Sequence, residues 1–275
     1  MVRAAVVTAL GLLAAAPGAA AAATPQIHAH RGGTFVAGKA TYAENTLPAF
    51  RGSAKRGFVL EMDTRVAQDG VVVMHDPTLE RTTGCDGRTS EMTLAAIAAC
   101  PSDIVGTPGS GLGSRVEEDG PSIPTLERAL ALAKELGATV NVELNDFDPE
   151  GVAAGRVLDV IAAAGLPKRR LIVQSFFPPN LALAKQRLPG VALAVLTLKV
   201  GEGSAIAAAR QAGAKWVSPE WPVSRGFVRR AHAAGRKVVP HTLDTRATVR
   251  AAQKAGVDAL ITDDPVMARR ALRRR

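Results

Sequence analysis

Two histidines and an arginine lie close together near the N-terminus, in the stretch "IHAHRGG" (27–33). His28 and His30 could form a His-x-His zinc pair, Arg31 could bind phosphate, or one histidine could be half of an acid–base system. A zinc site is disfavoured because further nitrogen or sulfur ligands are scarce in this chain. The choice between the other two depends on the residues that the fold brings to this stretch.

Three carboxylates stand in apolar stretches, where a cation site could form. Glu61 and Asp63 are two residues apart, so in a strand both side chains point to the same side. Glu143 occupies a similar place in "VELN". Neighbouring carboxylates repel one another unless a cation joins them, and all-oxygen ligation suits Mg²⁺ or Ca²⁺. The alternative is an ion pair with an arginine such as Arg31 or Arg65.

A further histidine, His75, lies in the apolar segment 71–76. Only a few residues separate this segment from Asp63, too few for a parallel crossover connection. The intervening "QDG" predicts a tight turn at its Asp-Gly pair, and the resulting hairpin would pair Asp63 with Asp76. We therefore expect His75 beside the carboxylates. A hard cation, Arg31 and two imidazoles would suit a phosphate ester, with one imidazole removing a proton and the other donating one.

An alternation of apolar and Ala-rich amphipathic stretches must position these residues. Eight apolar stretches joined by helical patterns predict a (β/α)8 TIM barrel, an α/β fold whose strand ends share one mouth. Hydrophobic residues make up 47% of the chain but aromatic residues only 4%, which suits parallel strands buried on both faces. The predicted strands are 26–30, 58–63, 139–145, 170–176, 191–198, 214–220, 236–243 and 257–264.

A segment without barrel character follows the hairpin. Residues 84–122 are rich in Gly, Ser and Asp, and we predict a small insertion after the second barrel strand, on the active face. It carries the only two cysteines of the chain, Cys85 and Cys100. An even number of cysteines in an exported protein favours a disulfide between them, and two free thiols are the alternative.

The first residues, 1–23, are apolar and Ala-rich with a single arginine. This composition predicts a signal peptide cleaved near Ala23, and hence a secreted or cell-envelope protein; a membrane anchor is the alternative. The remainder, 24–275, is predicted to be one domain.

The net charge of +9 is concentrated at the C-terminus, where the tail 267–275 contains five arginines. Such a tail predicts weak attraction to anionic envelope surfaces. Nucleic acid is not an expected partner, because aromatic residues are sparse and no recognition motif occurs.

Several motifs between residues 27 and 266 together resemble the glycerophosphodiester phosphodiesterase family: "HRGG", "AENT", "LEMDTRVAQDGVVVMHDPTLERTTG", "VELN", "QSF" and "GVDALITDDP". The resemblance implies a TIM barrel, a divalent cation (Mg²⁺ or Ca²⁺) and a small-molecule glycerophosphodiester substrate. Position by position it implies a catalytic pair, His30 and His75; a phosphate contact, Arg31; metal ligands, Glu61, Asp63 and Glu143; and supporting residues, Glu44 and Asn45.

Two positions depart from the family pattern. Family members usually have a lysine two residues after the third metal ligand, where this chain has Asn145. The family's Trp-Thr pair near the seventh strand end is His241-Thr242 here. A stacking surface for the alcohol part of the substrate is therefore either missing or supplied by Trp216, Trp221 or the insertion. The expected substrate-binding residues are therefore Arg31, Glu44, Asn45, Asn145, Gln174, Trp216, Trp221 and His241.

The expected function is metal-dependent hydrolysis of glycerophosphodiesters to glycerol 3-phosphate and an alcohol, with His30 as base and His75 as acid. One alternative is a phospholipase-D-like or cyclising reaction on lysolipids. Another is a non-catalytic protein that binds glycerophosphodiesters or teichoic polymers, for which the loss of the lysine at Asn145 is the supporting feature.

Overall fold

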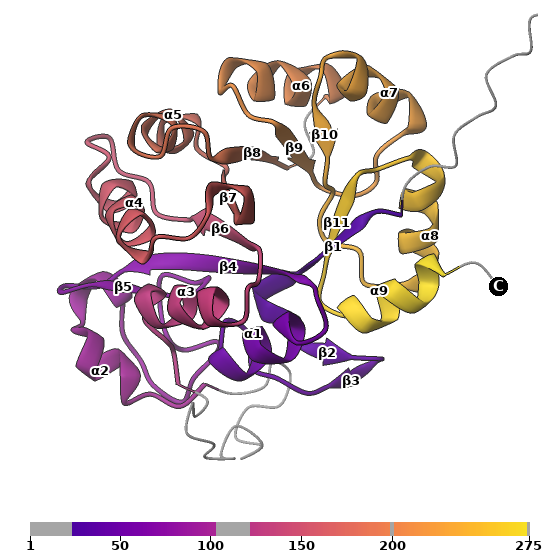
Figure 1. The fold of residues 1–275 in the computed structure, drawn as a ribbon. Coiled ribbons are helices and arrows are strands. Elements are labelled where there is room, and N and C mark those ends of the chain that lie inside the picture. Colours follow the sequence, from indigo (N-terminus) through magenta and orange to yellow (C-terminus); the bar gives the residue numbers. More distant parts are fainter. Residues whose placement is uncertain (1–23, 103–121, 199–200, 274–275) are drawn as a thin grey trace, which may run out of the picture.

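The computed structural model describes residues 24–102, 122–198 and 201–273. Its centre is a barrel of eight parallel strands, which confirms the predicted TIM barrel (Figure 1). The predicted signal peptide lies outside the described residues. Within them, no helix is long and apolar enough to cross a membrane. The barrel strands are β1 (Gln26–Ala29), β4 (Val59–Val66), β6 (Val140–Leu144), β7 (Leu171–Ser175), β8 (Ala192–Thr197), β9 (Trp216–Pro219), β10 (Lys237–Val238) and β11 (Ala259–Thr262).

The strands follow the order β10-β9-β8-β7-β6-β4-β1-β11 around the barrel. The first and last of these are joined by backbone hydrogen bonds from Asp258 N to Val238 O and from Ile261 N to Pro240 O, both 3.0 Å. β10 is short because Pro240 follows it closely and has no N–H to donate. These bonds nevertheless close the ring, so the polar strand ends meet at one mouth.

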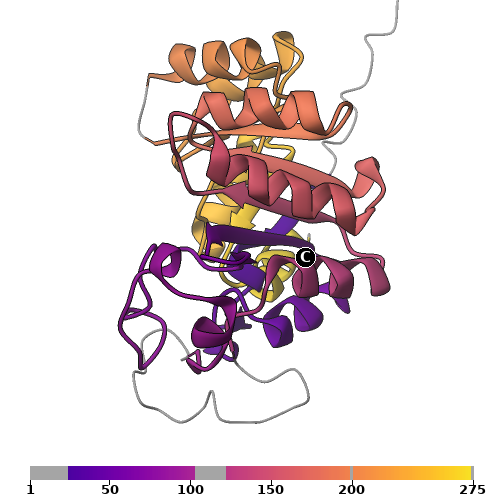
Figure 2. The same cartoon turned by 90° about the vertical axis from the view of Figure 1, so that its left-hand side faces the viewer.

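Helices surround the strands, as both views show (Figures 1 and 2). Neighbouring strand residues alternate between the two sides: Val217 packs in the core between strands and helices, whereas Trp216 lies in the barrel interior. The predicted glycine helix ends are confirmed at Gly165 and Gly256, with φ of 62° and 89°. The helices of the barrel are α1 (Leu47–Ala54), α3 (Leu126–Glu135), α4 (Val152–Ala164), α5 (Pro178–Arg187), α6 (Glu202–Gln211), α7 (Arg225–Ala233), α8 (Arg246–Ala255) and α9 (Pro265–Leu272).

Short elements lie outside this repeat. The one-turn helix η1 (His30–Gly32) follows β1, and a small hairpin of β2 (Phe35–Val36) and β3 (Lys39–Ala40) comes before α1. A further one-turn helix, η4 (Lys168–Arg170), leads into β7.

The hairpin from β4 exists, but its predicted register is wrong. β5 (Val71–Val72) pairs with the end of β4, with Val66 opposite Val71, and Met74 N donates to Asp63 O at 3.1 Å. Asp63 is therefore opposite Met74 and not Asp76. The turn begins one residue earlier than expected, because Ala67 N donates to Gly70 O.

Contacts with the insertion fix this turn. Asp69 accepts a hydrogen bond from Leu94 N at 2.7 Å, and Gln68 N donates to Met92 O at 2.9 Å. A Cβ on Gly70 would lie 2.4 Å from the Leu94 side chain, so glycine is needed there for close packing.

The described part of the insertion contains η2 (Thr89–Glu91) and α2 (Leu94–Ala98). Cys85 and Cys100 are joined by a disulfide, with their Cα atoms 6.0 Å apart. A small separate core, which includes Met74, Leu79 and Ile97, holds the segment against the hairpin. Residues 103–121 of the predicted insertion lie outside the described part of the chain.

Candidate active site

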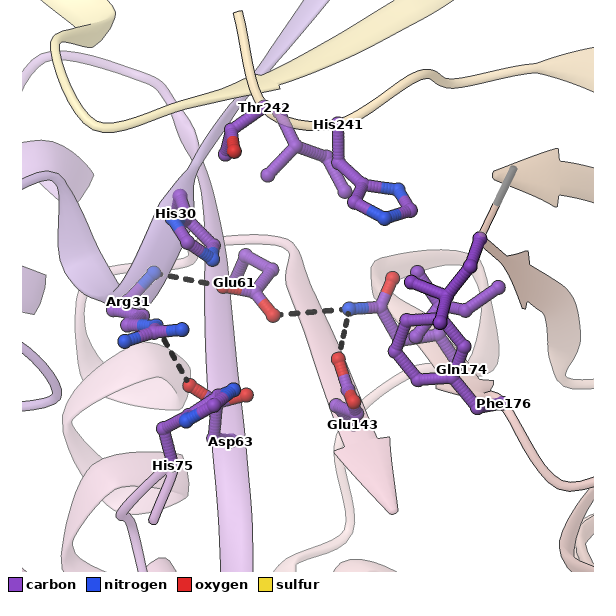
Figure 3. Close-up of a pocket in the computed structure, with 13 residues that line it drawn as sticks. His30, Arg31, Glu61, Asp63, His75, Glu143, Gln174, Phe176, His241 and Thr242 are labelled. Carbon is purple, nitrogen blue, oxygen red and sulfur yellow. Dashed lines mark hydrogen bonds and ion pairs between the residues drawn. The ribbon is translucent and has the colours of Figure 1, made fainter. Parts of the chain in front are cut away.

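A cavity of about 220 Å³ opens at the C-terminal ends of the strands (Figure 3). One wall is charged, and the other contains Phe176, Leu196 and Leu198. Most of the residues expected from the sequence come together here. The lining residues are His30, Arg31, Glu61, Asp63, His75, Glu143, Gln174, Phe176, Leu196, Leu198, His241, Thr242 and Ile261.

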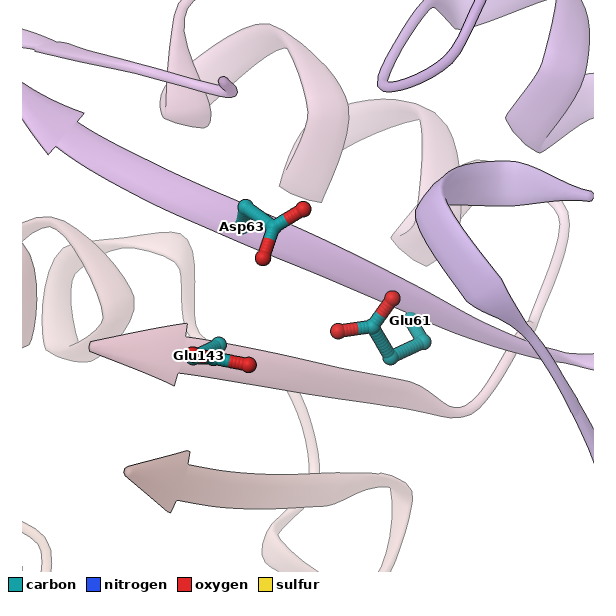
Figure 4. A group of neighbouring side chains, drawn as sticks. All are labelled: Glu61, Asp63 and Glu143. Carbon is teal, nitrogen blue, oxygen red and sulfur yellow. The ribbon is translucent and has the colours of Figure 1, made fainter. Parts of the chain in front are cut away.

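Three carboxylates form the floor of the cavity (Figure 4). Glu61 and Asp63 project from β4, and Glu143 projects from β6, where it is in register with Asp63. One oxygen from each lies within 4.8 Å of the others, and all three side chains are buried. Parallel pairing of β4 with β6 therefore assembles the predicted triad.

The triad concentrates negative charge that the protein only partly neutralises. Burial and the charge of Asp63 raise the pKa of Glu61 to about 7 and raise the pKa of Glu143 well above its ordinary value. Burial opposes ionisation of Asp63 too, but Arg31 and the two histidines outweigh it and lower its pKa. Three converging oxygens with unmet negative charge fit a hard divalent cation.

Arg31 supports the triad with both its backbone and its side chain. Its φ of 50° is unusual for a residue other than glycine, and its N–H donates to Glu61 Oε2 at 2.7 Å. Its side chain donates from Nη1 to Glu44 Oε1 at 3.0 Å, and its Nε lies 3.4 Å from Asp63 Oδ2. Arg65 instead pairs with Asp146 at 2.6 Å.

Both candidate histidines pair with a carboxylate through Nδ1. His30 contacts Asp263 and His75 contacts Asp76, each at 2.6 Å. Burial alone would lower the pKa of His30, but the hydrogen bond to Asp263 and the charge of Glu61 outweigh burial and raise the pKa to about 9. Each ring thus presents Nε2 as the nitrogen free to exchange a proton in the cavity.

Asn45 and Asn145 hold Asp63 from two sides. Asn45 Nδ2 donates to Asp63 Oδ2 at 2.9 Å, and Asn145 Nδ2 donates to Asp63 Oδ1 at 3.2 Å and to Glu143 Oε1 at 3.0 Å. Thr64 N in turn donates to Asn145 Oδ1 at 2.9 Å. Where the family usually has a lysine, this chain therefore has an amide that orients two carboxylates.

Gln174 is the top of a polar column in the barrel interior. Its Nε2 donates to Glu61 and Glu143 at 2.9 and 3.1 Å, and its Oε1 accepts from Asn141 Nδ2 at 2.7 Å. Asn141 also contacts His28 Nδ1 at 3.4 Å. Burial lowers the pKa of His28 to about 3, so its ring is neutral. His28 belongs to this column and does not line the cavity with His30.

The two tryptophans do not line the cavity. Trp216 is the first residue of β9, and it packs in the barrel interior beside His28, with ring centroids 6.3 Å apart. Trp221 packs against the main core. His241 does line the cavity, and its ring meets Phe176 edge-on at 6.1 Å. Burial, and next the charge of His30, lower the pKa of His241 to about 4.

Some contributing residues had no predicted role. Asp263, which directly follows β11, was given no role, yet it orients His30. Arg81 was not singled out, yet it donates to Glu44 Oε2 and Oε1 at 3.0 and 2.7 Å and to Asp76 Oδ1 at 3.1 Å. The available signals were its place five residues after Asp76 and within the quoted motif that resembles the family.

Arg81 also affects the charge of Asp76. Burial would raise the pKa of this carboxyl, but the hydrogen bonds from Arg81 and His75 outweigh burial and lower the pKa to about 2. Asp76 is therefore ionised beside His75.

Comparison with known proteins gives a consistent picture. A glycerophosphodiester phosphodiesterase of Bacillus altitudinis is 29% identical over 249 residues, which cover 87% of this chain and 95% of that protein. The crystal structure of a protein from Silicibacter pomeroyi superimposes with a TM-score of 0.75 at 26% identity, covering 90% of this chain and 93% of that chain. A phosphodiesterase from Oleispira antarctica, solved in complex with the product sn-glycerol-3-phosphate, gives a TM-score of 0.74 at 25% identity and covers 90% and 97% of the two chains.

The sequence model of the glycerophosphoryl diester phosphodiesterase family matches residues 30–267, from the first cavity histidine to the beginning of the last helix. This range contains the triad, both histidine–carboxylate pairs and Arg31. The chain therefore belongs to the glycerophosphoryl diester phosphodiesterase family.

Proposed function

We propose that this protein hydrolyses glycerophosphodiesters to glycerol 3-phosphate and a free alcohol. The observation that carries the proposal is the combination, in one cavity, of two carboxylate-paired histidines, an arginine and a buried carboxylate triad. The product found in the Oleispira antarctica phosphodiesterase supports the same substrate class.

In the proposed reaction, water attacks phosphorus and the bond from phosphorus to the alcohol oxygen breaks. Arg31 neutralises charge on the phosphate oxygens. One histidine accepts the proton of the water, and the other donates a proton to the leaving alcohol oxygen. Asp263 and Asp76 hold the two rings so that Nε2 faces the substrate.

Glu61, Asp63 and Glu143 would hold a divalent cation, Mg²⁺ or Ca²⁺. When bound, the cation would supply Lewis acidity toward the phosphate oxygens. Gln174, Asn45 and Asn145 donate hydrogen bonds to these carboxylates and would orient them for the cation.

The test is turnover of glycerophosphocholine by the full chain with and without EDTA, followed by addition of Mg²⁺ or Ca²⁺. We expect EDTA to abolish turnover and a divalent cation to restore it. His30→Ala and His75→Ala should each lower kcat by about 10²–10⁴-fold. His232→Ala, on the surface of α7, is the control. Full activity in EDTA would rule out the cation, and full activity of either variant would rule out the histidine pair.

A second candidate activity is cleavage of lysophospholipids, which the apolar wall favours. Leu198 is 63% exposed and Phe176 is 36% exposed beside the charged wall. An acyl chain would cover these side chains. The test is phosphorus NMR of lysophosphatidylcholine after incubation with the protein. A cyclic phosphate or a lysophosphatidic acid among the products would support this activity, and unchanged lysophosphatidylcholine would exclude it.

We also propose that the protein is exported, on the basis of the leader-like residues 1–23. Mass spectrometry of the protein from the culture medium of an expressing bacterium should find a chain that begins near Thr24. A full-length chain retained in the cytoplasm would contradict this.

A further inference from the structure

A second cavity, of about 240 Å³, lies at the other end of the barrel from the mouth. Its residues come from two segments: the loop between α1 and β4, and the last helix α9 with the residue that follows it. Both segments reach the N-terminal ends of the strands, because barrel helices run antiparallel to the strands. The lining residues are Arg56, Phe58, Val266, Arg269, Arg270 and Arg273.

Four guanidinium groups share this cavity without an acidic partner. Among the described residues, none of the four forms an ion pair with a carboxylate. Arg56 donates instead to Gly52 O at 2.6 Å, and Arg269 donates to Arg56 O. Burial, and next the charges of Arg273 and Arg56, lower the pKa of Arg269. The group thus holds positive charge that no carboxylate of the described residues balances through an ion pair.

An apolar surface fixes part of the cluster. The Arg269 guanidinium lies over the Phe58 ring, 3.9 Å from its centroid, and Phe58 is itself buried. Stacking on a ring restrains a guanidinium that would otherwise be mobile. The cavity therefore combines a restrained arginine with exposed arginines at its edge.

The helix dipole explains only part of this arrangement. Cations are favourable in the last turn of α9, where Arg269 and Arg270 lie. Arg56 caps the C-terminal end of α1 through Gly52 O, but neither helix end requires the arginines of the two segments to share one cavity.

We propose that this cavity is a binding site for a phosphate group. The planar guanidinium fork matches the oxygens of a phosphate, and several forks around one group neutralise its charge. The site lies apart from the active site, and the proposal does not depend on the proposed hydrolysis. The phosphate could belong to a soluble ligand or to a lipid headgroup, which have this chemistry in common.

The experiment compares wild type with the double variant Arg270→Gln/Arg273→Gln, whose two side chains are exposed. The control is Arg229→Gln/Arg250→Gln, which removes the same charge from exposed positions on α7 and α8. Circular dichroism melts establish that all three proteins are folded. One arm titrates inorganic phosphate calorimetrically at constant ionic strength, in EDTA. The other measures cosedimentation with phosphatidylcholine vesicles that contain or lack phosphatidylglycerol.

We expect the double variant to bind at least about tenfold more weakly than both wild type and control in one or both arms. Phosphate binding at the active site is common to all three proteins and cancels in this comparison. A loss confined to the calorimetric arm assigns a soluble phosphate ligand, and a loss confined to the vesicle arm assigns a lipid headgroup. Equal binding by all three proteins in both arms, or an equal loss in variant and control, would overturn the proposal.

Discussion

At the scale of single residues, His30 and His75 are each oriented by a carboxylate, but the two differ in setting. His30 lies close to Glu61 and contacts Asp263, and the raised pKa keeps its ring protonated at neutral pH. This charge state favours His30 as the proton donor, whereas the sequence led us to expect it as the base. The two assignments predict that kcat of the histidine variants depends differently on the leaving group of the substrate.

An activated leaving group distinguishes the two histidines, because p-nitrophenolate leaves without protonation. If His30 is the base and His75 the acid, His75→Ala should lose at least about 100-fold in kcat with glycerophosphocholine but less than about tenfold with a p-nitrophenyl glycerophosphodiester. His30→Ala should lose activity with both substrates. The reverse pattern would assign the donor role to His30.

Arg81 connects the two halves of the site, since it binds Asp76 behind His75 and Glu44 behind Arg31. We expect Arg81→Met to lower kcat about 100-fold with a smaller change in KM, because both partners lose their orientation. Arg81→Lys keeps the positive charge but lacks the planar guanidinium group that binds two carboxylates. It should therefore recover part of the lost kcat. Arg88→Met, an exposed arginine of the insertion, is the control. Wild-type kcat in Arg81→Met would exclude a positioning role.

At the scale of elements, β6 contributes both a carboxylate and the amide beneath it. Asn141 and Glu143 point to the same side of the strand, so Asn141 fixes the Gln174 amide that Glu143 accepts from. Without Asn141, Gln174 Oε1 has no donor among the described residues, and the amide can rotate away from the carboxylates. The proposed cation site thus depends on a residue that does not line the cavity.

Asn141→Leu keeps the branched shape and the number of heavy atoms of this side chain but removes its hydrogen bonds. We expect about a tenfold increase in the Mg²⁺ concentration needed for half-maximal activity, the size of effect typical of residues that orient metal ligands. Val195→Ala, in the core between strands and helices, is the control for a general loss of packing in the barrel. It should leave that Mg²⁺ concentration unchanged. An unchanged Mg²⁺ concentration for half-maximal activity in Asn141→Leu would show that the polar column does not affect cation binding.

The hairpin shows what a local pattern can and cannot predict. Its existence followed from the short distance between two apolar stretches, but its register depends on Leu94 and Met92, which belong to the insertion. Turn propensity cannot include such a tertiary contact. His75 still reaches the cavity, because the chain leaves the hairpin after β5.

At the scale of the whole molecule, the closed barrel encloses a histidine, His28, whose pKa burial lowers far below its ordinary value. The pKa of His28 is about 3 in the folded protein and about 6.5 in an unfolded chain. Below pH 6.5 the unfolded state binds a proton there that the folded state does not. Folding stability therefore falls as the pH falls, by about 1.4 kcal/mol per pH unit and by about 5 kcal/mol in all between pH 6.5 and 3.

Urea denaturation at a series of pH values between 6.5 and 4 tests this contribution. We expect the free energy of unfolding of His28→Gln to decline less steeply with falling pH than that of wild type, by up to about 1.4 kcal/mol per unit. The m-value should stay the same in both proteins, which shows that the same surface unfolds. If the free energy of unfolding of wild type and of His28→Gln declined equally steeply with falling pH, His28 would already titrate in the folded barrel.

The overall architecture and the central site residues were predictable because parallel strands place all their ends at one mouth. Glu61, Asp63 and Glu143 needed only strand order and side-chain alternation. The partners were not predictable: Asp263 lies 233 residues from His30 along the chain, and its pairing depends on side-chain geometry. Trp216 was expected near the substrate as a replacement for the tryptophan of the family's Trp-Thr pair, but the first residue of a strand lies at the far end from the mouth.

The barrel also gives the molecule a direction. Its arginine-lined cavity lies between α9 and the loop before β4, toward the N-terminal ends of the strands, whereas its histidine-lined mouth lies at their C-terminal ends. A protein tethered through the arginine-lined cavity would keep its mouth open to the surrounding medium. Attachment and turnover would then not compete for the same molecules, and the enzyme would process diesters that diffuse past instead of the headgroups beneath it.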